Sequence, residues 1–135
     1  RFSLYDCRSK ARVITVYGVK FGCAVKLADG NFLFALKKRG EKAKLMITDL
    51  SGNIIKQITL DNAPYTFFGG RQNGSGAIIY AAAQGRLKVV AYDGENLAEE
   101  QTSVRCAKVG CCGLNGKNML SVLNPLNYAF AYEVE

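Results

Sequence analysis

The chain has 135 residues, of which 49% are hydrophobic and 21% are charged, and its formal net charge is +7 at pH 7. This composition predicts a single globular domain over residues 1–135 and excludes a disordered or low-complexity chain. No apolar run reaches the roughly 18 residues of a membrane-spanning helix. The chain begins with Arg1 instead of Met, so we expect a fragment of a longer protein.

Short strands separated by turn residues are predicted along most of the chain. Val, Ile, Tyr and Phe gather in brief segments, and Asn-Gly or Asp-Gly pairs supply the positive φ of tight turns between them. The predicted strands are residues 2–6, 12–17, 23–27, 32–37, 44–48, 54–60, 65–68, 77–82, 87–92 and 119–123. The glycine-rich segment 69–76 precedes a strand and not a helix, so we expect a hairpin loop there and not a phosphate-binding loop.

The C-terminal segment fits two alternatives. Asn124 and Pro125 suit the start of a helix, which would be apolar nearly all round and therefore buried. With a period of two, Leu126, Tyr128 and Phe130 lie on one apolar face of a strand, together with Tyr132 and Val134. The composition of the segment favours the strand.

A weak repeat runs through the chain. Asp6, Asp49 and Asp93 each follow an apolar strand and begin a turn, at intervals of about 43 residues. Such a period is typical of propeller blades. Three blades cannot close a propeller, so this interpretation requires further sequence or oligomerisation.

The residue types argue against catalysis and against a metal centre. The chain has no histidine, so Ser-His-Asp and Cys-His arrangements and histidine metal sites are excluded. The acidic cluster Asp93, Glu95, Glu99 and Glu100 surrounds a predicted turn, where we expect it to be solvated. The five cysteines are odd in number and have no Cys-x-x-Cys spacing, so we expect reduced thiols in a reducing cytosol. We therefore predict a non-enzymatic protein without a cofactor.

The densest local charge lies in residues 37–44, where Lys37, Lys38, Arg39, Lys42 and Lys44 are cationic. The segment connects two apolar strands, so we expect a hairpin tip that projects into water. Cations on such a turn suit phosphate oxygens, although lysines at a strand end also protect a sheet edge from aggregation. The net charge favours an acidic partner, namely nucleic acid, an anionic membrane or an acidic protein.

Several segments follow one another in an order known from one family. These are the strand and basic run at 29–39, the strand with its Asp-Leu-Ser turn at 45–51, the strands at 54–58 and 65–68, the paired segments within 77–89, and the Pro-Leu start at 124–131. Over most of the chain this order resembles the C-terminal domain of tubby-like proteins. Two departures are visible: Gln57-Ile58-Thr59 replaces the family's arginine beside Lys56, and the region before the last segment is shortened.

The resemblance implies an all-β, closed antiparallel barrel around an apolar C-terminal helix, and a phosphoinositide-binding domain that tethers or adapts at a membrane. It implies a cytoplasmic protein, peripheral on the inner membrane surface, whose partners are anionic phospholipid headgroups or acidic proteins. The expected headgroup residues are Lys37, Lys38, Arg39, Lys42, Lys44 and Lys56. Nucleic acid is not expected, because that interpretation depends on net charge alone.

The alternative fold is a set of propeller-type blades or a β-trefoil, acting as a protein-interaction scaffold. A buried helix at residues 125–132 would support the barrel, and a strand would support the alternative. The expected core residues are Leu33, Phe34, Ile47, Ile55, Ile79, Val89, Leu120 and Phe130. Leu33 and Phe34 are adjacent in a strand, so both are buried only if that strand is covered on its two faces.

Overall fold

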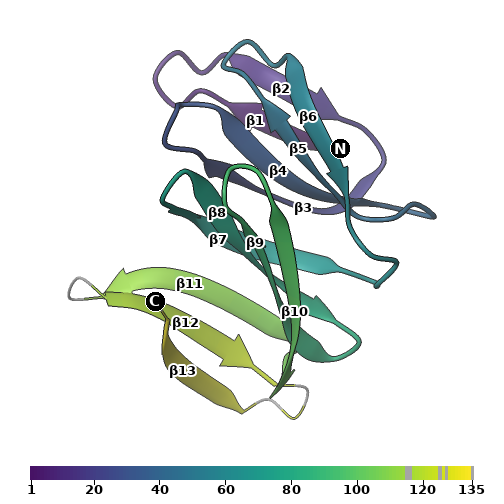
Figure 1. Ribbon diagram of the computed structural model, residues 1–135, viewed down its shortest axis with the longest axis vertical. Helices are drawn as coiled ribbons and strands as arrows, with labels where there is room; N and C mark the ends of the chain where they lie inside the picture. Colours follow the sequence, from purple (N-terminus) through teal and green to yellow (C-terminus); the bar gives the residue numbers. More distant parts are fainter. Residues whose placement is uncertain (115–116, 125, 127, 135) are drawn as a thin grey trace.

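A computed structural model describes residues 1–114, 117–124, 126 and 128–134. These residues form 13 strands in four antiparallel sheets and contain no helix (Figure 1). The all-β prediction is therefore confirmed. Within this part of the chain no sheet closes into a barrel.

The sheets follow one another along the chain, and each is formed by consecutive strands. The first sheet contains β1 (Phe2–Tyr5) and β2 (Arg12–Val16). The second contains β3 (Val19–Lys26), β4 (Phe32–Lys38), β5 (Lys44–Thr48) and β6 (Ile54–Thr59). The third contains β7 (Thr66–Asn73), β8 (Gly76–Ala83), β9 (Arg86–Tyr92) and β10 (Leu97–Arg105). The fourth contains β11 (Lys108–Leu114), β12 (Lys117–Leu123) and β13 (Ala129–Val134).

The four sheets stack face to face, from the first at the top of Figure 1 to the fourth at the bottom. Strand β3 lies beside β7, and β7 lies beside β11, so the first strands of three successive sheets are neighbours. Each interface between sheets is an apolar layer. The layers centre on Phe34 and Leu36 between the first two sheets, on Leu33 and Ile79 between the second and third, and on Tyr80 and Val122 between the third and fourth.

The adjacent residues Leu33 and Phe34 are both 0% exposed, as predicted. They point to opposite faces of β4, and each face is covered by a different neighbouring sheet. The covering elements are thus sheets on both sides and not a barrel wall and a central helix. On the first-sheet side, the ring of Phe2 meets Phe34 edge-on, with centroids 5.7 Å apart.

Glycines allow some of the close approaches between strands. A Cβ on Gly70 in β7 would lie 2.6 Å from the backbone oxygen of Ile78 and 3.0 Å from Val25 Cγ2 in β3. A Cβ on Gly76 would lie only 1.6 Å from the backbone oxygen of Tyr92. No side chain fits at either position, so these glycines set the spacing of β7 from β3 and of β8 from the end of β9.

Each sheet contains a turn organised by one Asp or Asn side chain. The Oδ1 atoms of Asp6, Asp49, Asp93 and Asn124 each accept two backbone N–H groups from the turn that follows. Hydrogen bonds from Asn53 lower the pKa of Asp49, and hydrogen bonds from Asn96 and Glu95 lower that of Asp93. The weak repeat in the sequence therefore corresponds to a recurrent turn, and Asn124 takes the same role in the fourth sheet.

The C-terminal helix that the tubby-like resemblance implies is wrong, because Ala129–Val134 is strand β13. Residues 125 and 127 lie outside the described part of the chain. The strand alternative is confirmed for β13, but Phe130 is 49% exposed and not buried. It pairs with the buried Val122, yet β13 is the edge strand of its sheet, so no strand beyond it extends the apolar layer over the ring.

Four further core predictions are confirmed, since Ile47, Ile79 and Leu120 are buried and Val89 packs against the core in a half-buried position. Ile55 is wrong, with 57% of its surface exposed, because β6 is an edge strand. Strands β10 and β11 were not predicted. Strand β10 carries mostly polar residues, and strand β11 contains two glycines, so neither has the usual strand pattern.

Candidate functional site

The basic segment forms the turn between β4 and β5, as expected. We call residues Lys37–Lys44 the basic turn. Lys38 ends β4 and pairs with Val19 of β3, while Lys44 begins β5 and pairs with Leu36 and Thr59. Arg39 and Lys42 between them are exposed. The turn thus presents its cations at one end of the second sheet.

Lys37 is partly used inside the turn. Its Nζ donates a hydrogen bond to the backbone oxygen of Glu41, and its side chain is half-buried. Lys37 also lies on the face of β4 that carries Leu33 and Ala35, whereas Lys38 lies on the opposite face. The five cations therefore point in more than one direction, and Arg39 and Lys42, which are exposed, are the most available to an external ligand.

Lys20 of β3 lies beside the basic turn, and it was not identified from the sequence as a candidate binding residue. It lies in β3 next to Val19, and an open hollow is lined by Gly18, Val19, Lys20 and Arg39. Its Nζ is 5.4 Å from the ring centroid of Phe21. Only the pairing of Val19 with Lys38 brings Lys20 close to Arg39, and no local motif reveals that pairing.

Lys56 is placed away from the basic turn. Its Nζ donates to the backbone oxygen of Glu95 at 3.3 Å and lies 5.4 Å from the ring centroid of Tyr92. Lys56 pairs with Ile47, whereas Lys44 pairs with Thr59, three residues further along β6. The structure therefore places five of the six expected headgroup residues on one turn, where they face different sides, and directs the sixth toward the opposite end of the sheets.

The turns alternate between two ends of the stack, because consecutive strands are antiparallel. The basic turn lies at the same end as the β6–β7 connection, since Leu60 N donates to Ala43 O at 2.8 Å. The β8–β9 turn lies at that end too, because Thr66 at the start of β7 pairs with Ala82 near the end of β8. It meets the β10–β11 connection, where Cys106 N donates to Gly85 O at 2.9 Å. We call the end of the stack that carries all four of these connections the β4–β5 end; it lies on the right of Figure 1.

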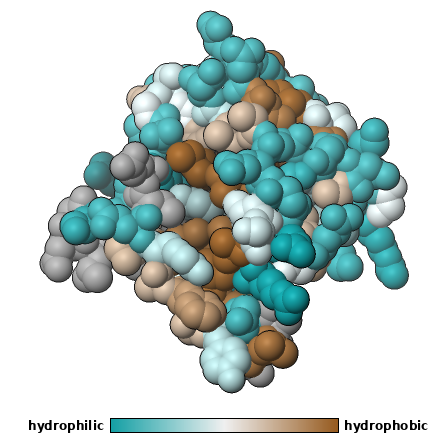
Figure 2. Space-filling view, turned by 60° about the horizontal axis from the view of Figure 1, so that its bottom comes forward, coloured by the Kyte–Doolittle hydropathy of each residue, from teal (hydrophilic) through white to brown (hydrophobic). Residues whose placement is uncertain are grey.

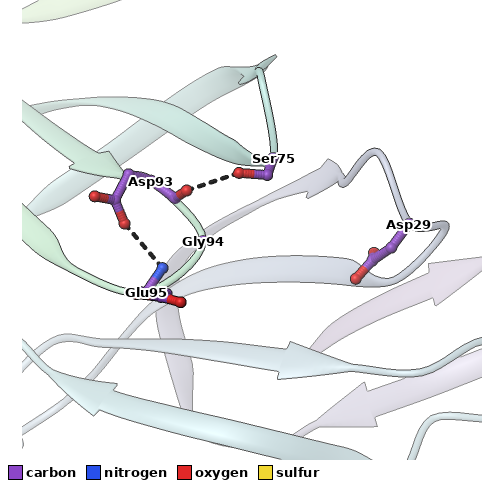
Figure 3. Close-up of a pocket in the computed structure, with 5 residues that line it drawn as sticks. All are labelled: Asp29, Ser75, Asp93, Gly94 and Glu95. Carbon is purple, nitrogen blue, oxygen red and sulfur yellow. Dashed lines mark hydrogen bonds between the residues drawn. The ribbon is translucent and has the colours of Figure 1, made fainter.

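The opposite end carries a pocket lined by acidic residues from two sheets (Figure 3). Asp29 comes from the β3–β4 turn, and Asp93 and Glu95 come from the β9–β10 turn. Asp29 and Asp93 each accept backbone N–H groups of their own turns, and Ser75 Oγ donates to Asp93 O at 2.8 Å. Their oxygens are therefore engaged in shaping the turns. In the described residues no group of three or more His, Cys, Asp or Glu side chains could hold a metal ion.

A buried polar cluster ties the β6–β7 connection to the third sheet. Lys88 of β9 is 5% exposed, and its Nζ forms an ion pair with Asp61 and lies 3.9 Å from Glu99 Oε1. Tyr65 donates its hydroxyl hydrogen to Glu99, and the Lys88 ammonium lies 4.8 Å from the Tyr65 ring centroid. Burial and the neighbouring carboxylates raise the pKa of Tyr65 far above 10.0. The cluster is satisfied internally, so it stabilises the fold and offers no free reactive group.

The cations of the basic turn have no acidic partners. The ion pairs among the described residues join Lys88 to Asp61 and Glu99, and Lys117 to Glu133. Arg39, Lys42 and Lys20 are in none of them. Arg39, Lys42 and Lys20 therefore have no salt-bridge partner at the β4–β5 end, although the Glu41 carboxylate belongs to the same turn, and this group of cations is the chemical feature that most distinguishes the surface.

Exposed apolar side chains gather around the fourth sheet. Figure 2, which turns the bottom of the molecule forward, shows hydrophobic surface between hydrophilic areas. The exposed large residues of this region are Leu126, Tyr128, Phe130 and Tyr132. No helix among the described residues is long and apolar enough to cross a bilayer.

Three cysteines can be assessed, and all are free: Cys7 is exposed, and Cys23 and Cys106 are buried. Burial raises the pKa of the Cys106 thiol. The side chains of Cys111 and Cys112 lie outside the described part of the structure. The expectation of five reduced thiols stays a prediction.

Comparison with known proteins gives no relative: no protein-family model matches the sequence, and no curated protein matches it.

Proposed function

We propose that this chain is a non-enzymatic binding module made of propeller-type blades, and that it binds an acidic segment of a protein partner at the β4–β5 end. The observation that carries the proposal is the group of exposed cations Lys20, Arg39 and Lys42 at that end, which take part in no ion pair among the described residues and have the half-buried Lys38 beside them. An extended acidic peptide can contact such separated cations in turn, and long-range attraction speeds its association.

The arrangement of the sheets supports propeller-type blades over a trefoil. The second and third sheets are both four-stranded meanders, and they stack with their first strands side by side. The strand β13, where the barrel alternative needs a helix, supports the same choice. Ends of stacked blades present several turns on one surface, which suits the recognition of a partner that spans more than one sheet.

The test is the binding of a labelled oligoglutamate peptide, followed by fluorescence anisotropy at low salt. Charge reversal by Arg39→Glu with Lys42→Glu should reduce the affinity at least tenfold, about 1.4 kcal/mol. The matched control is Arg8→Glu with Lys26→Glu, which changes the net charge equally at the opposite end of the sheets. Equal losses in both variants would show attraction by overall charge alone, and the proposal would be wrong.

A phosphoinositide headgroup is the second candidate ligand, and the hollow beside the basic turn favours it. Lys20 and Arg39 line that hollow, and the tubby-like resemblance assigns the headgroup to the basic run. Each cation near an anionic leaflet contributes roughly 1 kcal/mol, which salt weakens. Sedimentation with phosphoinositide liposomes, compared with phosphatidylserine liposomes of equal total charge, tests this candidate. Equal binding to both would leave only nonspecific attraction, and no binding at low salt would exclude the membrane ligand.

A further inference from the structure

Two arginines face each other at the β4–β5 end of the third sheet. Arg86 begins β9 and Arg105 ends β10, and they are direct register partners in the antiparallel ladder. Such partners share one face of the sheet, with Cβ atoms about 5 Å apart. Both are exposed. Like charges directly opposite each other destabilise a sheet, so this pair lowers the stability of the isolated protein.

The two arginines have no carboxylate partner among the described residues. Neither arginine takes part in an ion pair with any residue that the structure describes. Arg86 Nη1 donates to the backbone oxygen of Ser103 at 3.2 Å, which orients its guanidinium group. Arg105 makes no side-chain hydrogen bond within the described residues. Most of the guanidinium donors therefore remain available to an external anion.

The backbone around the pair is held in place. The register between β9 and β10 shifts between Gln101 and Arg105, and the pairing of the two strands resumes at Arg86 and Arg105. Next to it, the buried Cys106 donates its N–H to Gly85 O. Lys108 begins β11 three residues after Arg105, but it lies on the face of β11 opposite the buried Val109 and therefore points away from the arginine pair.

The pair is also oriented toward the site of the proposed function. Arg86 lies two residues before Lys88 in β9, so both point to the same face of the third sheet. That face packs against the second sheet, which carries the basic turn. A peptide bound along the β4–β5 end can therefore reach both groups of cations.

We infer that Arg86 and Arg105 bind a phosphate monoester on the acidic partner. The inference depends on the proposed function, because it specifies the partner as a phosphorylated acidic segment. Two planar guanidinium groups offer paired donors and two positive charges, which match a phosphate carrying nearly two negative charges and three acceptor oxygens. A single carboxylate has two oxygens and one charge, so it would leave donors unused.

The first experiment compares two labelled acidic peptides of equal net charge by fluorescence anisotropy. One contains a phosphoserine, and the other has two glutamates in its place. The wild-type protein should bind the phosphopeptide about tenfold more tightly, a difference of about 1.4 kcal/mol. Arg86→Lys with Arg105→Lys keeps the charge but removes the planar forks, so it should abolish the preference. The control Lys38→Gln with Lys42→Gln should weaken both peptides and preserve their ratio.

Equal affinities in the wild type, or a preference that survives the double lysine variant, would overturn the inference. A second experiment separates it from the proposed function: inorganic phosphate is titrated while the arginine Nε–H signals are followed by NMR, with acetate as control. Selective, saturable shifts of Arg86 and Arg105 support the phosphate site, even if neither peptide binds and the proposed function fails. Unmoved arginine signals overturn the inference, whereas peptide binding at the basic turn would still support the proposed function.

Discussion

The ion pair between Lys88 and Asp61 joins a buried cation to a half-exposed carboxylate. Removing Asp61 and removing Lys88 should therefore cost different amounts of folding stability. The Lys88 side chain is 6% exposed, and that of Asp61 is 46% exposed. Removing one partner of a buried pair typically costs about 3–5 kcal/mol, because the other charge is left without compensation. Here the buried charge is the ammonium group, so the larger cost should follow from the loss of Asp61.

For Asp61→Asn we expect a loss of about 2–3 kcal/mol, below the typical range because Glu99 remains 3.9 Å from the ammonium nitrogen. For Lys88→Met we expect about 1 kcal/mol or less, since the apolar stem is kept and water can reach the Asp61 carboxylate. Urea unfolding followed by circular dichroism measures both differences, provided that the m-values agree. A Lys88→Met protein that loses more stability than Asp61→Asn would refute the reasoning.

The same ion pair predicts that the folding stability depends on pH in the acid range. Burial acts to raise the pKa of Asp61, but the ion pair with Lys88 and the nearby Tyr65 hydroxyl outweigh it and hold the pKa below 3.8. A carboxyl whose folded-state pKa is lowered stabilises the protein fully above its unfolded-state value, and that stabilisation is lost as the pH falls through the folded-state value. The acid side of the stability profile should therefore be flatter in Asp61→Asn than in the wild type, and parallel profiles would contradict this.

Three other predictions test the packing. Phe34→Ala should cost about 3–5 kcal/mol and Phe130→Ala less than about 1 kcal/mol, because only the former ring is fully buried; similar melting temperatures for the two variants would contradict this. Gly76→Ala should cost more than Gly74→Ala in urea unfolding, since an added Cβ meets a backbone oxygen at 1.6 Å in the first case, whereas in the second it meets open space and only the positive φ of 58° opposes it. Alkylation under native conditions should modify Cys7 before the two buried cysteines, and mass spectrometry of a time course would reveal any other order.

Strands with strong apolar patterns could be predicted from the sequence, and strands defined by their neighbours could not. β-branched and aromatic residues define β4, β5 and β8, which lie inside sheets where propensity and burial agree. Strand β10 is an outer strand whose Glu99 and Glu100 resemble a solvated turn, and its ladder with β9 decides its conformation. For the same reason Phe130 was expected in the core, because a single sequence does not reveal which strand lies at an edge.

The candidate site was predictable only where it is local. The basic turn is one continuous segment, so charge density and flanking strands locate it directly. Lys20 depends on the pairing of Val19 with Lys38, and Arg86 depends on its register with Arg105. Lys56 was grouped with the turn on the basis of a family resemblance, but its position on β6 directs it to Glu95. In each case the cross-strand register, which cannot be read from the sequence, decides whether a residue belongs to the site.

The burial of β4 on both faces also bears on how the protein opens. A sheet whose two surfaces are both covered cannot separate from one neighbour without exposing apolar side chains, so its amides should exchange with solvent only in large, costly openings. The first and fourth sheets each pack against one described neighbour and can detach alone. In stacked arrays stability is shared between adjacent units. Hydrogen exchange should therefore be slowest in β4, β5 and β8 and become faster toward β1 and β13.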